Sequence, residues 1–319
     1  MKIAFHDNSL CLFGTTLAVY NWAYWGRELL GIEPIIMYNG NNRSNNQSVV
    51  EKFSNTFDGK VIPYTHPSQI DGILQTNGCT HFFMEKCGRR DGIISNVCKN
   101  LVNAIAVCTP QDIHGDVFAM ASEWLCKTID NRVPCVPYIV TLPDSNLDLR
   151  DELGIPKDGF VFARNGGFET FDIPFVKEAI REVIDERSDL WFVFQCTEKF
   201  IDHERVLFLP PSTDPDYKVK FINTCDAMLH ARAVGESFGM ACGEFSIRNK
   251  PIVTWWGSPE RSHIEILGET GIYYEDKSEI SDILYSITKA DIKDRDWNAY
   301  RRYTPEKVME QFKTVYLGA

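Results

Sequence analysis

The sequence predicts an α/β protein with two domains, each built on a doubly wound parallel sheet. Short apolar runs alternate with segments of helical periodicity from the first residues onward. This alternation pauses at the proline-rich stretch 134–146 and then restarts. The chain of 319 residues is long enough for two domains of about 150 residues, each with its own core. Its content of 44% hydrophobic and 24% charged residues excludes disorder as the main state.

In the first half, apolar runs bounded by turn residues predict strands, and longer periodic segments predict helices. The expected strands span 2–5, 34–38, 60–63, 80–84 and 104–108. The expected helices span 16–30, 67–75 and 116–127. For the Asn-rich run 39–47 we expect a solvated loop rather than a contact to an acceptor.

After the proline-rich stretch the same pattern repeats. The expected strands span 160–164, 190–195, 206–209, 227–230, 251–254 and 272–274. The expected helices span 174–186, 216–224, 279–288 and 305–316, with one more that begins at 238–240. We therefore expect a first domain over residues 1–146 and a second over 147–302.

The charge and hydropathy of the chain argue against two classes of partner, nucleic acid and the interior of a membrane. A net charge of −11 argues against nucleic acid, because phosphate backbones are held by clustered Lys and Arg. The basic residues form only pairs, such as Arg89-Arg90 and Arg301-Arg302. No run of about 18 apolar residues predicts a membrane span, and residues 1–5 are too short for the apolar part of a signal peptide. We expect a soluble protein, at most peripheral to a membrane.

The ten cysteines show no C-x-x-C pair and no spacing with histidine that is typical of metal sites. Several lie inside apolar runs, as Cys108 does, where a free Cys behaves as a small hydrophobic residue. We expect reduced cysteines and a cytoplasmic protein.

The stretch 226–256 carries the strongest functional signal. It is expected to form a buried strand, a polar turn ending at Glu236 and Ser237, a helix and a second strand. The free N–H groups and the dipole of a helix N-terminus favour phosphate or sugar oxygens, and Gly239 would let the backbone approach them. We expect Glu236 to accept hydrogen bonds from sugar hydroxyls and Glu244 to bind ribose hydroxyls. Alternatively, one glutamate favours the helix dipole and the other is an ordinary surface residue.

This stretch resembles the E-x7-E signature of the retaining nucleotide-sugar glycosyltransferases of family 4, which are relatives of glycogen synthase. The likeness covers both glutamates, the turn 237–240, the pair Glu244-Phe245, the strand at 250–253, and the segments 154–156, 160–167 and 305–316. The whole second half of the chain matches, whereas the first half matches weakly.

The resemblance implies a GT-B fold, in which two Rossmann-like domains face a cleft and ligands bind at the carboxyl ends of the strands. It implies that the segment 303–319 returns to the first domain. The implied reaction moves a sugar, with retention, from a nucleotide-sugar donor to a glycan, lipid-linked or protein-linked acceptor. No metal or other cofactor is expected, since no D-x-D pair stands at a strand end in a context that suggests one. A monomer and a dimer are both compatible with the sequence.

Arg164, at the end of an expected strand, matches the cation that the family uses for the donor diphosphate; a surface ion pair is the alternative. The family usually adds a lysine about half a dozen residues later, and this chain lacks it. The amides of Gly166 and Gly167, or Lys199, are candidates to replace that lysine.

Two further backbone segments are expected at the donor. The helix N-terminus formed by Ser237, Phe238, Gly239 and Met240 is expected to bind the diphosphate. Backbone groups near Leu209 are expected to contact the nucleotide base, although nothing there distinguishes UDP, GDP and ADP sugars.

In the first half, Gly14 and Thr15 follow the first strand and could offer N–H groups to a phosphate, or Thr15 could be a plain helix cap. Relatives often place a His against the transferred sugar where Cys108 stands here. We therefore expect His114, six residues later, to act with Glu236 and Arg164 as a catalytic residue; the alternative is a solvated loop His.

The segment 85–92 lies at another strand end and carries Lys86, Arg90 and Asp91, which are candidates to bind the acceptor or a phosphate. The alternative there is an ordinary charged loop. Two other functions also fit the sequence: a different GT-B enzyme such as a nucleotide-sugar epimerase or a sugar phosphorylase, and a non-catalytic protein that binds sugar nucleotides. The missing lysine and the Cys108 replacement favour the non-catalytic function.

Overall fold

The computed structural model describes residues 1–318, which form two compact units. The first unit contains Met1–Ile139 together with the residues from Tyr303 onward, and the second contains Val140–Arg302. The expected domain boundary after residue 146 therefore falls inside the second unit. Ala319, the last residue of the expected returning segment, lies outside the described residues.

The first unit is built on one parallel six-stranded sheet in the order β3-β2-β1-β4-β5-β6. Its strands are β1 (Lys2–Asp7), β2 (Glu33–Asn39), β3 (Val61–Tyr64), β4 (His81–Lys86), β5 (Lys99–Ala104) and β6 (Val117–Met120). The chain moves outward from β1 in one direction and then in the other, so β1 and β4 are neighbours at the point where the strand order reverses. Loops diverge at the carboxyl ends of two such strands, which makes this switch point the usual binding position of the fold.

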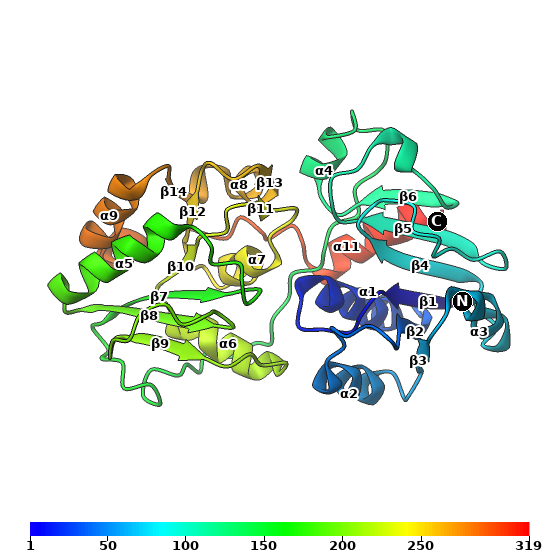
Figure 1. Cartoon of the computed structure of the whole chain (residues 1–319), viewed down its shortest axis with the longest axis horizontal. Helices are drawn as coiled ribbons and strands as arrows, with labels where there is room; N and C mark the ends of the chain where they lie inside the picture. The colour runs from blue at the N-terminus through cyan, green and yellow to red at the C-terminus, as the bar shows by residue number, and fades with distance from the viewer. Residues whose placement is uncertain (319) are drawn as a thin grey trace. The chain divides into compact units, whose positions relative to one another are not determined.

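Helices cover this sheet. They are α1 (Gly14–Leu30), α2 (Gln47–Thr56), α3 (Ile70–Thr76), α4 (Glu123–Lys127) and α11 (Pro305–Phe312), with the 3-10 turns η1 (Pro67–Gln69) and η2 (Pro110–Asp112) and the π-helical turn η4 (Lys313–Leu317). Figure 1 shows α11, coloured red, beside the blue α1, although the two are distant in sequence. The Phe83 ring lies 5.0 Å from Trp22 of α1 and 5.4 Å from Phe312 of α11, so the returning helix completes an aromatic core.

Two expected elements of the first unit are wrong, and buried polar side chains explain the first. The strand expected at 104–108 lies instead at β5, where Asn100 and Asn103 are both buried. The Asn100 side chain accepts a hydrogen bond from the Ser95 amide (2.8 Å), and Asn103 Nδ2 donates to the Val136 carbonyl (2.9 Å). These partners lie outside the strand, so the local apolar pattern could not reveal that two asparagines are tolerated inside it.

The helix expected at 116–127 is a strand followed by a short helix. The first part forms β6, which pairs with β5 through Phe118 opposite Val102. The second part forms α4, and Ser122 caps it by accepting a hydrogen bond from the Leu125 amide (3.2 Å). Pairing with a neighbouring strand therefore overrides the helical periodicity of this segment.

The second unit repeats the architecture. Its parallel six-stranded sheet has the order β14-β12-β10-β7-β8-β9, with a separate two-stranded pair, β11 and β13. The strands are β7 (Phe160–Asn165), β8 (Leu190–Gln195), β9 (Val206–Leu209), β10 (Ala227–His230), β11 (Gly235–Glu236), β12 (Ile252–Trp255), β13 (Glu260–Arg261) and β14 (Ile272–Tyr274). Here β7 and β10 are the neighbours at the switch point.

The helices of the second unit are α5 (Pro174–Glu186), α6 (Pro215–Thr224), α7 (Met240–Ile247), α8 (Ser262–Leu267), α9 (Lys277–Ser286) and α10 (Lys289–Lys293), with the 3-10 turn η3 (Gly268–Thr270). The apolar face of α5, for example Val176, Ile180 and Val183, packs into the core under the sheet. The prediction of two doubly wound parallel sheets is confirmed. Within residues 1–318, no helix combines the length and the apolar character needed to cross a membrane.

Candidate functional site

The strongest candidate site lies at the carboxyl edge of the second sheet. Arg164 is the penultimate residue of β7, and His230 is the last residue of β10. The two strands are hydrogen-bonded neighbours and their following loops lead in different directions, to α5 and to β11. The two side chains therefore stand on either side of the switch point.

Arg164 is a buried cation with neutral partners. Its Nη1 donates to the Cys196 carbonyl (3.1 Å) and to Thr197 Oγ1 (2.6 Å), and its Nη2 donates to the Gly167 carbonyl (2.8 Å) and to Thr170 Oγ1. Only 3% of the residue is exposed, and burial lowers the pKa of the guanidinium to about 10, so it stays charged at neutral pH. No carboxylate within residues 1–318 lies in ion-pair contact with it. A buried charge without a counter-ion is unfavourable unless a ligand supplies one.

The loop after β7 is shaped around this guanidinium. A Cβ atom on Gly166 would lie 2.6 Å from Arg164 Nη2, so any other residue here would displace the guanidinium from its present position. Gly167 uses its carbonyl to accept from Arg164, and Thr170 accepts from it as well. Thr170 lies in the segment where the family that the sequence resembles usually carries a lysine, and it accepts a hydrogen bond from Arg164 without adding a second charge.

Lys199, the other expected replacement for that lysine, points to solvent. Its side chain is 58% exposed and its Nζ lies 2.8 Å from Asp202 Oδ1. The structure does not bring it into contact with Arg164.

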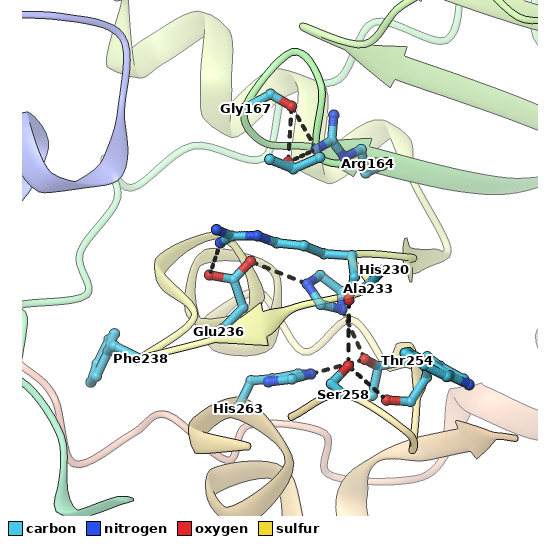
Figure 2. Close-up of polar contacts among 12 residues, drawn as sticks. Arg164, Gly167, His230, Ala233, Glu236, Phe238, Thr254, Ser258 and His263 are labelled. Atoms are coloured by element: carbon cyan, nitrogen blue, oxygen red, sulfur yellow. Dashed lines mark hydrogen bonds and ion pairs between the residues drawn. The ribbon is translucent and has the colours of Figure 1, made fainter. Parts of the chain in front are cut away.

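Glu236 ends the two-residue strand β11, next to the switch point. Gly235 before it has φ +82°, and a Cβ atom there would lie 2.1 Å from the Glu260 carbonyl, so the close pairing of β11 with β13 requires glycine. Glu236 Oε2 accepts from Arg232 Nη1 (3.0 Å), and Oε1 accepts from His230 Nε2 (3.2 Å). Figure 2 shows the carboxylate turned toward the His230 ring.

The same contacts keep Glu236 ionised. Burial opposes ionisation, but the hydrogen bond from His230 and the charge of Arg232 outweigh it and lower the pKa of the carboxyl to about 2. The charge of Glu236 in turn favours the protonated form of Arg164. The switch point thus presents a cation and an anion that are not paired with each other.

The turn from Ser237 to Met240 leads into α7, as expected. Gly239 precedes the helix with φ +87°, and no side chain caps its N-terminus. A Cβ atom on Gly239 would lie 3.0 Å from both His263 Cβ and Tyr300 Oη. Tyr300 Oη also donates to the Phe238 carbonyl (3.0 Å), which fixes the backbone at this corner.

Glu244 and Leu209, the residues expected at the nucleoside, already have partners in the same unit. Glu244 is buried in α7, and its Oε1 lies 2.7 Å from Lys218 Nζ of α6. Leu209 is half-buried at the end of β9, and its carbonyl accepts from the Cys196 amide (3.2 Å). Cys196 thus connects the Leu209 backbone to the loop that holds Arg164.

In the first unit, four expected residues come together at the carboxyl end of β4. Lys86 is buried, and its Nζ lies 2.5 Å from Asp91 Oδ1 and 3.3 Å from His114 Nε2. Arg90 is exposed and donates to the Ile113 carbonyl (2.7 Å). Burial lowers the pKa of Lys86, and the Asp91 carboxylate opposes that shift.

His114 is a buried residue rather than a solvated loop residue. Its Nδ1 lies 2.6 Å from the Asp112 carbonyl, which can only accept, so Nδ1 carries the proton and Nε2 accepts from Lys86. Burial lowers the pKa of His114, and the neighbouring Lys86 lowers it further. Both ring nitrogens are therefore occupied in this conformation.

Gly14 and Thr15 form the first turn of α1, which begins without a side-chain cap. The hydroxyl of the next residue, Thr16, points inward and donates to Asp7 Oδ2 (2.7 Å) at the end of β1. Gly14 is exposed and Thr15 half-buried, so their backbone N–H groups are the accessible ones at this helix end.

Sequence reasoning missed the partners of the two main site residues. His230, Arg232, Thr170 and Thr197 all contact Glu236 or Arg164 directly. One signal was available: His230 is a polar residue at the end of a buried strand, six positions before Glu236. The threonines carry no such signal, because hydroxyl residues are common in loops. Within residues 1–318, no group of three or more His, Cys, Asp or Glu side chains is placed to hold a metal ion.

Comparison with known proteins adds the fold family. No family model matches the sequence, and no curated protein matches it. Solved structures do match. Anabaena HepE in complex with UDP-glucose superposes with a TM-score of 0.74 at 13% identity, over 100% of both chains. A glycosyltransferase from Rickettsia africae gives a TM-score of 0.67 at 12% identity, over 98% of this chain and 94% of its own.

A candidate UDP-N-acetylglucosamine 2-epimerase from Listeria monocytogenes gives a TM-score of 0.59 at 12% identity, over 100% of this chain and 97% of its own. The fold is GT-B. The expected GT-B class with two Rossmann-like domains is therefore confirmed, and at these identities the likeness establishes the fold alone.

Proposed function

We propose that the protein is a retaining, metal-independent glycosyltransferase that uses a nucleoside diphosphate sugar as donor. The observation that carries the proposal is Arg164, a buried guanidinium with neutral partners at the switch point of the second sheet. A diphosphate is the kind of ligand that would balance this charge, because guanidinium and phosphate form strong charge-assisted hydrogen bonds.

The geometry suits a reaction in which negative charge leaves the donor. Arg164 and the backbone at the start of α7 would hold the diphosphate and stabilise the charge that develops when the glycosidic bond breaks. The sugar becomes oxocarbenium-like, and the ionised Glu236 would accept hydrogen bonds from its hydroxyls. The leaving phosphate oxygen would take the proton of the acceptor hydroxyl on the same face, so retention requires no protein nucleophile and no metal.

The fold comparison suggests a donor to test first. HepE was crystallised with UDP-glucose, which makes UDP-glucose a reasonable probe for this chain. We further propose that Glu244 binds the ribose, with Lys218 beside it. A hydroxyl acceptor on a glycan, a lipid-linked or a protein-linked sugar completes the reaction. The ten free cysteines favour a cytoplasmic location.

The test is a binding and turnover panel. Calorimetry with UDP-, GDP- and ADP-glucose should give saturable binding of at least one donor, and the nucleoside diphosphate should be released in the presence or absence of added sugar acceptors. NMR of the product would show an anomeric configuration equal to that of the donor, and EDTA would leave the rate unchanged. An inverted product would contradict retention, and a rate lost in EDTA and restored by Mg²⁺ or Mn²⁺ would contradict metal independence.

A nucleotide-sugar epimerase is the second candidate, and the Listeria structure is the observation that favours it. Incubation with UDP-N-acetylglucosamine followed by NMR would reveal a C2 epimer if this were the activity. Saturable binding of a nucleotide sugar without release or epimerisation would instead identify a non-catalytic binding protein.

A further inference from the structure

A chain of hydrogen bonds runs from Glu236 into the interior of the second unit. Glu236 Oε1 lies 3.2 Å from His230 Nε2, His230 Nδ1 lies 2.8 Å from Thr254 Oγ1, and Thr254 Oγ1 lies 3.1 Å from His263 Nε2. Figure 2 shows the chain of dashed lines from the carboxylate through His230 to His263. The three inner residues are 4%, 0% and 0% exposed, so the chain is closed to solvent beyond Glu236.

Three separate elements hold this chain. His230 ends β10, Thr254 lies directly opposite it in the register of β12, and His263 lies in the first turn of α8. The His230 and His263 rings are 4.8 Å apart. Buried polar groups destabilise a core unless they are hydrogen-bonded, so a chain of three buried polar side chains that ends at Glu236 requires an explanation beyond packing.

The hydrogen atoms can be placed so that each group in the chain donates to the next group toward Glu236. An ionised carboxylate only accepts, so His230 Nε2 donates to it. If the Thr254 hydroxyl donates to His230 Nδ1, its oxygen accepts from His263 Nε2. The remaining atom, His263 Nδ1, is then unprotonated, and it is a buried nitrogen without a partner within residues 1–318. Burial lowers the pKa of His263 to about 3, which agrees with a neutral ring.

We infer that Thr254 and His263 are positioning residues, which act through His230 to keep the Glu236 carboxylate ionised and turned toward the sugar of the bound donor. The inference rests on the proposed function, because it assigns these residues to the sugar-binding carboxylate of that site. It predicts that they matter for the sugar part of the donor and not for its nucleotide part.

The groups that face Glu236 determine its response to pH. Besides His230 and His263 they are Arg232 in the loop after β10, Arg164 of β7, Glu260 of β13 and Cys242 of α7. In the intact chain the carboxyl, whose pKa is about 2, is ionised throughout the neutral and mildly acidic range. Breaking the chain weakens the hydrogen bond from His230 while burial continues to oppose ionisation. The carboxylate is then lost at a higher pH as the solution is acidified.

The experiment compares Thr254→Val, which removes the bridging hydroxyl at nearly constant volume, with Thr254→Ser, which keeps it. Calorimetry gives the Kd of UDP and of UDP-glucose for each protein between pH 5.5 and 8. The Kd of UDP divided by the Kd of UDP-glucose measures how much the sugar contributes to binding. We expect the same ratio in the wild type and Thr254→Ser, and a ratio about tenfold lower in Thr254→Val, because the carboxylate loses its orientation; any further loss from protonation should appear toward pH 5.5.

Thr224→Val is the matched control for packing. Thr224 is also fully buried in this unit, and its hydroxyl makes two hydrogen bonds to backbone groups. The variant Thr224→Val should lower thermal stability without changing the ratio of the Kd of UDP to the Kd of UDP-glucose. His263→Gln, whose amide nitrogen can replace Nε2, should preserve the ratio, whereas His263→Leu should reduce it as Thr254→Val does; this second pair decides the question if Thr254→Val does not fold.

The outcomes separate the two proposals. If wild-type protein binds UDP-glucose but Thr254→Val and His263→Leu keep its ratio and pH dependence, the positioning role is wrong and the proposed function stands. If wild-type protein binds no nucleotide sugar, the proposed function fails and this inference fails with it.

Discussion

The two units carry the same strand order but treat charge at their switch points in opposite ways. In the first unit, Lys86 at the end of β4 is neutralised by Asp91, a residue of the loop that directly follows it. In the second unit, Arg164 at the end of β7 donates only to carbonyl and hydroxyl oxygens. Equal topology therefore does not mean equal chemistry: the cation at the first switch point has a carboxylate partner, and the cation at the second has only neutral hydrogen-bond partners.

The carboxyl groups show the same contrast. Burial raises the pKa of Asp7 in the first unit to about 6, and burial raises that of Glu85 as well, with Asp7 adding to the shift. In the second unit, His230 and Arg232 lower the pKa of Glu236 to about 2 despite its burial. Burial thus makes Asp7 and Glu85 of the first unit harder to ionise, whereas Glu236 of the second is kept as an anion.

The largest expected effect comes from Arg164→Met, which removes the cation of the second switch point. Loss of the charge-assisted hydrogen bonds to the diphosphate should weaken UDP-glucose binding about 1,000-fold, or about 4 kcal/mol, in calorimetry. Arg150→Met is the control, since Arg150 is also largely buried in this unit but pairs with Asp226 at 2.8 Å. It should lower stability and leave affinity unchanged. Equal affinities for Arg164→Met and wild type would remove the basis of the donor site.

The next effect concerns Asp7 and tests whether its burial opposes ionisation. A carboxyl whose pKa is raised from 3.8 to about 6 on folding stabilises the protein at low pH, and this contribution is lost as pH rises through that window. Asp7→Asn should therefore gain up to about 3 kcal/mol relative to wild type between pH 4 and pH 7.5, measured by urea unfolding. Asp130→Asn, whose parent side chain is 84% exposed, should show no such trend.

Lys86→Met tests whether the first switch point is structural. The substitution leaves Asp91 and His114 without their partner and should lower the free energy of unfolding by about 2 kcal/mol. In the proposed function the donor binds in the other unit, so the Kd of UDP should not change. Lys60→Met, which breaks an exposed ion pair with Glu33, should cost less than about 1 kcal/mol. A weakened Kd for UDP in Lys86→Met would contradict the assignment of the donor to the second unit.

The smallest expected effect tests whether Glu244 binds the ribose of the nucleotide. If Glu244 binds the ribose, wild-type protein should prefer UDP over 2′-deoxy-UDP by about tenfold, and Glu244→Gln should lose most of that preference, about 1.4 kcal/mol. Glutamine can still accept from Lys218, so the fold should be retained. An unchanged preference in Glu244→Gln would show that the glutamate serves only to pair with Lys218.

The elements of the second unit were the easier to predict. β9, β10 and β14 have the expected bounds because each is a short apolar run between polar turns and is paired within one sheet. The first unit contains the errors, at 104–108 and at 116–127. There the strand that forms includes Asn100 and Asn103, whose partners lie elsewhere in the chain, and the helix gives way to the edge strand β6.

The site follows the same rule. Arg164, Glu236 and Gly239 stood out because they lie at expected strand and helix ends and match the signature that the sequence resembles. The sequence also placed Lys86, Asp91 and His114 among the candidates, but it could not show that these three contact one another. Nor could it reveal that Lys199 pairs with Asp202 in solvent instead of joining Arg164.

The amino-acid pattern alone determined the fold class, the repeated α/β halves and, to within one residue, where β7 and β10 end, since apolar periodicity and turn residues act over a few positions. Tertiary structure decided which charges are compensated and which are not. That outcome depends on pairs far apart in the chain, such as Arg164 with Thr197 and Thr254 with His230, and on how completely each is removed from water. Electrostatic energy depends on distance and burial in three dimensions, and neither can be read from the order of residues.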